Sequence, residues 1–108
     1  MRNFHEESDL ENQDWELFIT AWAEVIGDKT VTCQECEGLL KMNAEFAVTL
    51  PEELEPTLND RRKSFARTLG RALSKREKRP YGEKSLAFQR AGEKKRAALW
   101  RVAPIKAR

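Results

Sequence analysis

Residues 59–76 read NDRRKSFARTLGRALSKR, a segment with two faces of opposite character. Apolar residues recur at helical spacing and form one stripe: Phe65, Leu69, Ala72 and Leu73. The opposite face is basic and polar: Lys63, Arg67, Arg71 and Ser74. Asn59 or Asp60 is expected to cap this helix, and Arg79-Pro80 to stop it soon after Arg76. A helix that buries one face and presents an arginine row on the other is suited to a polyanion, although many charged helix faces are simply solvated.

The charge of the chain is divided between its two halves. The 108 residues carry a net charge of +2. Residues 1–60 hold three basic and fifteen acidic residues, a net charge of −12, whereas residues 61–108 hold seventeen basic and three acidic residues, a net charge of +14. A chain that needs charge for solubility alone intersperses the two signs. The division favours a dipolar molecule whose basic side is attracted to phosphates.

Length and composition limit the class of protein. A chain of 108 residues is expected to form one domain with a modest core. It holds no window of 18 consecutive apolar residues, and its N-terminus is acidic, so we expect neither a membrane-spanning helix nor a signal peptide. Two cysteines do not build a disulfide scaffold, which favours a reducing compartment, the cytoplasm.

The N-terminal quarter of the chain predicts an arm followed by a helix. Residues 1–13 are polar and aperiodic, and we expect a flexible arm or linker there. Residues 14–26 carry an apolar stripe that includes Trp15 and Trp22. Tryptophans on one stripe could stack with bases, but at helical spacing beside other large apolar residues they indicate a core helix.

Two further helices and a strand are expected before the basic helix. Residues 29–31 are short and β-branched, which predicts a strand. Thr32 and Glu35 form a capping box, so a helix is expected over residues 33–43. A second capping box, TLPE, places a proline at the first helical position and predicts a short helix over residues 51–58.

Cys33 and Cys36 allow two interpretations. Thiols in the first turn of a helix can have a lowered pKa, as in thiol redox proteins, and two of them can supply half of a zinc site. The sequence has no second cysteine pair, its one histidine is His5 in the expected arm, and no βαβ pattern surrounds the motif. We therefore favour structural cysteines, and expect no metal ion or other cofactor.

Two segments with alternating apolar residues follow the basic helix and predict a β-hairpin. Residues 86–89 form the first strand and residues 98–102 the second, with a tip over residues 90–96 that carries four basic residues. The expected fold is mainly α with a small β-hairpin. Its order of elements is that of a winged helix-turn-helix over residues 14–103, followed by a basic tail at residues 104–108.

The pattern also resembles one protein family. It is carried by Trp15, LPEEL at residues 50–54, FARTLGRAL at residues 65–73, Tyr81-Gly82 and LWRV at residues 99–102. These residues look like the winged-helix domain at the C-terminal end of phage- and plasmid-type primase-helicases and related replication proteins. The resemblance implies a domain that helps to place a catalytic core on DNA, and that core is not in this chain.

Two groups of residues are expected to contact DNA, duplex rather than single-stranded. In a winged helix-turn-helix the third main helix enters the major groove, where its exposed side chains reach base edges. In this sequence they are Arg62, Lys63, Ser64, Arg67, Arg71 and Lys75. The helix end and the wing are expected to hold backbone phosphates. Their residues are Arg76, Lys78, Arg79, Arg90, Lys94, Lys95 and Arg96.

The sequence offers no pattern for catalysis. It has no glycine-rich phosphate loop ending in Lys-Ser/Thr and no Gly-x-Ser-x-Gly elbow. We therefore expect a binding module rather than an enzyme. A different class of function is a docking domain in which the acidic half addresses a basic partner, such as a replication protein, without direct DNA contact.

Overall fold

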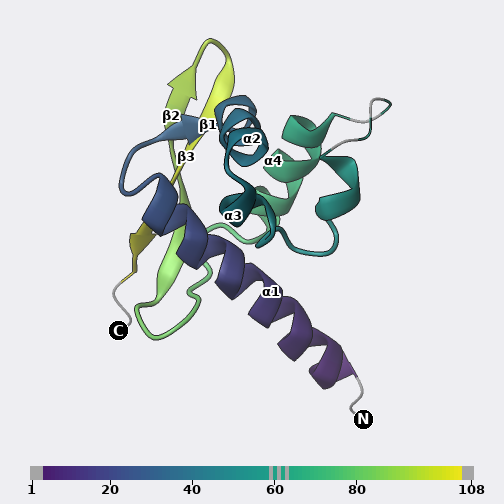
Figure 1. Ribbon diagram of the computed structural model, residues 1–108. Coiled ribbons are helices and arrows are strands. Elements are labelled where there is room, and N and C mark those ends of the chain that lie inside the picture. Colours follow the sequence, from purple (N-terminus) through teal and green to yellow (C-terminus); the bar gives the residue numbers. More distant parts are fainter. Residues whose placement is uncertain (1–3, 59, 61, 63, 106–108) are drawn as a thin grey trace.

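The computed structural model describes residues 4–58, 60, 62 and 64–105, with side chains described from residue 12 onward. Four helices and a three-stranded antiparallel sheet make up an α+β fold (Figure 1). The elements, in chain order, are α1 (Phe4–Val25), β1 (Val31–Thr32), α2 (Cys33–Met42), α3 (Ala44–Ala47), a 3-10 turn η1 (Glu55–Thr57), α4 (Phe65–Lys75), β2 (Leu86–Lys94) and β3 (Ala97–Pro104). Among the described residues, no helix has the length and apolar character needed to cross a membrane.

The sheet has the order β1-β3-β2, with both pairs antiparallel. Val31 of β1 pairs with Trp100, and Phe88 of β2 pairs with Val102. A short strand is therefore present, but it lies at Val31–Thr32 and not at residues 29–31 as predicted, and it adds to the free edge of β3. Because β1 has two residues, the distal part of the hairpin extends beyond it.

Aromatic side chains fill the core between α1, α3 and the sheet. Phe18 stacks on Phe46 of α3 at a centroid distance of 5.6 Å, and Trp22 meets Phe88 edge to face at 5.2 Å. All four side chains are fully buried, as is Trp15. The expectation that the tryptophans of the first helix are core residues is confirmed. Edge-to-face pairs of this kind contribute about 0.5–1.5 kcal/mol each beyond their buried area.

The first half of the chain departs from the prediction in two places. α1 begins at Phe4, so residues 4–13, expected as an arm, continue the helix. This polar stretch lacks the apolar stripe that marks the helix from residue 14. The prediction of an arm from its polarity was therefore wrong for residues 4–13. The second departure is η1: the TLPE box does not start an α-helix, because Thr49 Oγ1 donates to the carbonyl of Phe46 at 2.6 Å. The residues before it form α3, which the sequence did not predict.

The capping box that starts α2 is confirmed. The Glu35 backbone N–H donates to Thr32 Oγ1 at 3.1 Å, and the Thr32 backbone N–H donates to Glu35 Oε1 at 2.9 Å. The basic helix starts later than expected. Its cap is Ser64, whose Oγ accepts from the Arg67 backbone N–H at 3.1 Å, and not Asn59 or Asp60.

The hairpin is longer than predicted and its turn is tighter. Lys95 and Arg96 alone form the turn, with φ values of 52° and 71°. Arg90 and Lys94, which the prediction placed at the tip, lie within β2. The register shifts between Arg90 and Glu93 at a bulge around Gly92. This bulge marks the start of the distal hairpin, which we define as residues 93–98.

Candidate functional site

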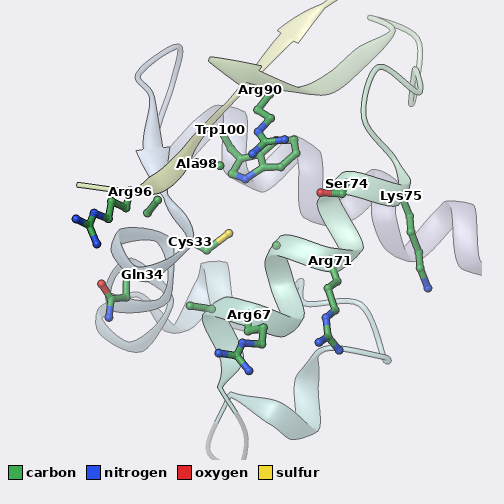
Figure 2. A pocket seen from close by; sticks show the side chains of 13 residues that line it. Cys33, Gln34, Arg67, Arg71, Ser74, Lys75, Arg90, Arg96, Ala98 and Trp100 are labelled. Atoms are coloured by element: carbon green, nitrogen blue, oxygen red, sulfur yellow. The ribbon is translucent and has the colours of Figure 1, made fainter. Parts of the chain in front are cut away.

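A groove of about 790 Å³ runs between α4, the first turn of α2 and the β-hairpin (Figure 2). Five basic side chains line it: Arg67, Arg71, Lys75, Arg90 and Arg96. We call this set the basic groove. Two elements, α4 and the β-hairpin, supply its cations. These five residues, which the sequence assigns to the basic helix and the wing, line one groove, and their contact with DNA stays a prediction.

The wall formed by α4 follows from the periodicity of that helix. Arg67, Arg71 and Lys75 are spaced four residues apart, which places them on one line along the exposed side (Figure 2). The opposite side is buried against the core through Phe65, Leu69, Ala72 and Leu73. The apolar stripe thus fixes the rotation of α4, and that rotation places Arg67, Arg71 and Lys75 on the exposed side of the helix, at the edge of the groove.

The floor of the groove is uncharged and carries small residues. Gly70 of α4 lies against α2, where a Cβ added at this position would be 3.6 Å from Cys33 Sγ. Trp100, which is 2% exposed, closes the floor on the hairpin side, and the Arg90 guanidinium lies over its ring at 6.0 Å from the centroid. Since Trp100 is buried, it supports the floor and does not offer a face for stacking. Cations on the walls and a neutral floor suit an extended anionic ligand.

Arg76 is the clearest error among the predicted contact residues. The sequence assigned it to a backbone phosphate, but the residue is 6% exposed. Its guanidinium carbon lies 4.2 Å from the centroid of the Trp15 ring, and its Nη2 is 3.1 Å from Glu53 Oε1. Glu53 also accepts from Trp15 Nε1 at 3.2 Å. Arg76 therefore joins α4 to α1 and to the segment before η1, and no phosphate can reach it.

Two predicted residues before α4, Arg62 and Ser64, do not line the groove. Ser64 caps the helix through its side chain, so its hydroxyl has a structural role. Arg62 lies in the preceding turn, where it is exposed and its backbone N–H donates to Asp60 Oδ1 at 2.9 Å. Lys63 lies outside the described residues.

The turn after α4 carries two more predicted cations. Lys78 and Arg79 are both exposed, but neither lines the basic groove. The backbone holds this turn in place, since the Lys78 N–H donates to the carbonyl of Phe88 at 2.9 Å and Lys78 has a φ of 67°. Here the structure neither adds to the prediction nor contradicts it.

The remaining wing residues differ from one another. Lys95 is exposed at the turn. Lys94 donates to Glu35 Oε2 at 2.8 Å, and this contact lowers the pKa of the Glu35 carboxyl, helped by the hydrogen bond from Thr32. Lys94 is thus partly neutralised by an acidic residue of α2, and no local pattern predicts this contact because the two residues lie 59 positions apart.

The two thiols do not have the properties of a redox pair. Burial raises the pKa of the Cys33 thiol to about 11, and burial also raises the pKa of Cys36. Nucleophilic thiols have a lowered pKa, so the structural interpretation is favoured. Within the described part of the chain, no three His, Cys, Asp or Glu side chains lie close enough together to hold a metal ion.

No family model, curated protein or solved structure matches the chain. The chemistry of the basic groove is therefore the basis for a functional inference. Sequence reasoning missed Gln34, Glu35 and Trp100 as residues in or beside this groove. The capping box located Glu35 correctly, but the contact that matters for the groove depends on the tertiary fold.

Proposed function

We propose that the protein is a winged-helix DNA-binding module in which α4 is the recognition helix and the β2–β3 hairpin is the wing. The observation that supports this most strongly is the basic groove, since five cations from two elements gather around one concavity. The order β1-β3-β2, with α4 directly before the hairpin, is compatible with a winged helix. Phosphate contacts give most of the affinity of such proteins for DNA.

In the proposed mechanism, one sugar-phosphate backbone of a duplex lies along the basic groove. Arg90 and Arg96 on the wing hold phosphates, together with Lys75 at the end of α4. Arg67 and Arg71, which lie nearer the start of α4, are placed to reach guanine O6 and N7 when the helix enters the major groove. Because phosphate contacts outnumber these two base contacts, we expect modest sequence preference.

The biological role that we propose is to place a replication protein of the primase-helicase type on DNA in the cytoplasm. The resemblance of residues 65–73 and 99–102 to such domains supports this role, and two free thiols fit a reducing compartment. The domain would then act as a binding module for a catalytic core located elsewhere.

A salt titration of duplex binding tests the proposal. The three cations proposed to hold phosphates, Lys75, Arg90 and Arg96, predict a log-log slope of affinity against salt of about −3. The double variant Arg67→Ala/Arg71→Ala is expected to bind more than tenfold more weakly and to lose the preference for guanine, with little change in slope. A matched control, Lys29→Ala/Lys84→Ala, removes the same charge at exposed positions outside the groove and should change affinity by less than about threefold. Equal losses in the two variants would refute a role for the groove.

A second candidate function is docking to a basic protein partner. It is favoured by the outer side of α1, where Leu17 is 61% exposed between acidic residues that include Glu16 and Glu24. This surface bears the opposite charge to the basic groove. Retention on DNA resin with elution by salt favours the first function, whereas co-purification with a replication protein in the absence of a DNA shift favours the second.

A further inference from the structure

We infer that Glu35 is a positioning residue for the basic groove: through Lys94 it holds the distal hairpin against the first turn of α2, and so fixes the wall that carries Arg96. The inference rests on the proposed function for its importance to DNA binding, but the contact itself can be tested without DNA. Glu35 does not line the groove, and its negative charge would by simple electrostatics weaken DNA binding.

The distal hairpin has reason to need such support. Its strands continue past β1, whose partners in β3 are Leu99 and Trp100, so the third strand does not cover residues 93–98. The bulge between Arg90 and Glu93 interrupts the ladder at the point where this support ends. Two-stranded ribbons are marginally stable by themselves, so a side-chain contact there has leverage over the position of the tip.

Glu35 of α2 connects the distal hairpin, through Thr32, to β1 and to the β3 residue that pairs with it. Its Oε2 accepts from Lys94 Nζ at 2.8 Å, while its Oε1 accepts from the Thr32 backbone N–H at 2.9 Å. Thr32 is at once the cap of α2 and the residue of β1 that pairs with Leu99. The contacts therefore form a closed circuit from β2 through Glu35 and Thr32 to β3. A carboxylate held at both oxygens has few alternative rotamers, which makes it a suitable anchor for Lys94.

The same contact sets the distance between the groove walls. Gln34 and Cys33, in the first turn of α2, line the groove opposite residues Arg96, Ala97 and Ala98. Since Lys94 pairs with Ala97 across the turn, fixing Lys94 against α2 fixes this second set as well. Release of the contact would allow the hairpin to move away from α4 and would separate Arg96 from the arginine row.

The decisive variant is Glu35→Gln. Glutamine also serves as the third residue of a capping box, so the variant keeps the cap of α2 and removes the charge that binds Lys94. We expect duplex affinity to fall about two- to fivefold, the range for an exposed ion pair, even though a negative charge has been removed. The matched control is Glu37→Gln, whose carboxylate pairs with Lys41 at 3.2 Å on the same helix. Glu37→Gln removes the same charge, and its affinity for duplex DNA should equal that of the wild type or be slightly higher.

Two measurements separate positioning from direct contact. In the free protein, amide hydrogen exchange over residues 93–98 should be about two- to fivefold faster in Glu35→Gln, while that of Phe88 and Val102 stays unchanged. In a double-mutant cycle, Lys94→Gln should weaken binding less in the Glu35→Gln background than in the wild type. Unchanged exchange, an equal effect of Lys94→Gln in both backgrounds, or binding by Glu35→Gln as tight as by Glu37→Gln would each overturn the inference. Absence of DNA binding by the wild type would instead refute the proposed function, and the exchange measurement would still decide whether Glu35 holds the hairpin.

Discussion

Replacement of Arg76 by alanine should destabilise the fold without removing a DNA contact. Its guanidinium lies 4.2 Å from the Trp15 ring centroid, a cation–π contact worth about 2 kcal/mol where water is excluded. The ion pair with Glu53 adds about 1 kcal/mol or less, because the Glu53 side chain is 45% exposed and can be solvated once its partner is gone. With the lost packing of the aliphatic stem, we expect a cost of about 2–4 kcal/mol, which lowers the melting temperature of a domain of this size by about 10–20 °C.

The measurement is thermal and urea unfolding followed by circular dichroism at neutral pH. The matched control is Arg71→Ala, which removes an exposed arginine from the same helix and should change stability by less than about 0.5 kcal/mol. In a DNA-binding assay below both melting temperatures the order should be reversed: Arg71→Ala should bind DNA more weakly than the wild type, and Arg76→Ala should not. If Arg76→Ala unfolded at the temperature of Arg71→Ala and bound DNA equally weakly, the assignment of Arg76 to the interior would be wrong.

Three other outcomes follow from the geometry. Gly70→Ala should stabilise the protein by about 0.5–1 kcal/mol, because the added methyl group would lie at 3.6 Å from Cys33 Sγ and alanine favours a helix; a lower urea midpoint would mean that α2 and α4 pack too closely for a methyl group. Cys33, with a pKa raised to about 11, should react with a disulfide reagent at pH 8 about 200-fold more slowly than an unperturbed cysteine of pKa about 8.5, because its thiolate fraction is lower by that factor, and reaction at the ordinary rate would revive the redox interpretation. Because Lys94 lowers the pKa of Glu35, the stability from their contact is fully present above the unfolded pKa of about 4.3 and is lost as the pH falls through the lower folded pKa. An NMR titration should therefore place the Glu35 midpoint below about 4.3, and Lys94→Gln should raise it; equal midpoints in the two proteins would contradict this.

The sequence predicted those features of the basic groove that depend on the helical period of the apolar residues and on the order of the elements along the chain. The stripe from Phe65 to Leu73 fixed which side of α4 faces outward, and the position of the hairpin after α4 brought Arg90 and Arg96 to the same surface. The N-terminal cap of α4 was not fixed, because Asn59, Asp60 and Ser64 are all good capping residues and local rules do not choose among them.

The helical spacing of α4 indicates that Arg76 is buried, although an arginine is usually expected at the surface. It lies four residues after Ala72 and seven after Leu69, so it continues the buried stripe of α4. An arginine at such a position calls for an acidic and an aromatic partner, and these come from Glu53 and Trp15, which only the tertiary fold brings together. The contact between Glu35 and Lys94 could not be inferred for the same reason.

The turn at the end of the hairpin sets charge against backbone preference. Lys95 and Arg96 both adopt positive φ, a conformation that costs an ordinary L-residue about 1 kcal/mol and that Asn-Gly adopts readily. The double substitution Lys95→Asn/Arg96→Gly would thus ease closure of the hairpin while it removes two positive charges. At these two positions, a substitution that makes the turn more rigid also weakens its attraction for anions. A redesigned hairpin turn therefore gains one property at the expense of the other.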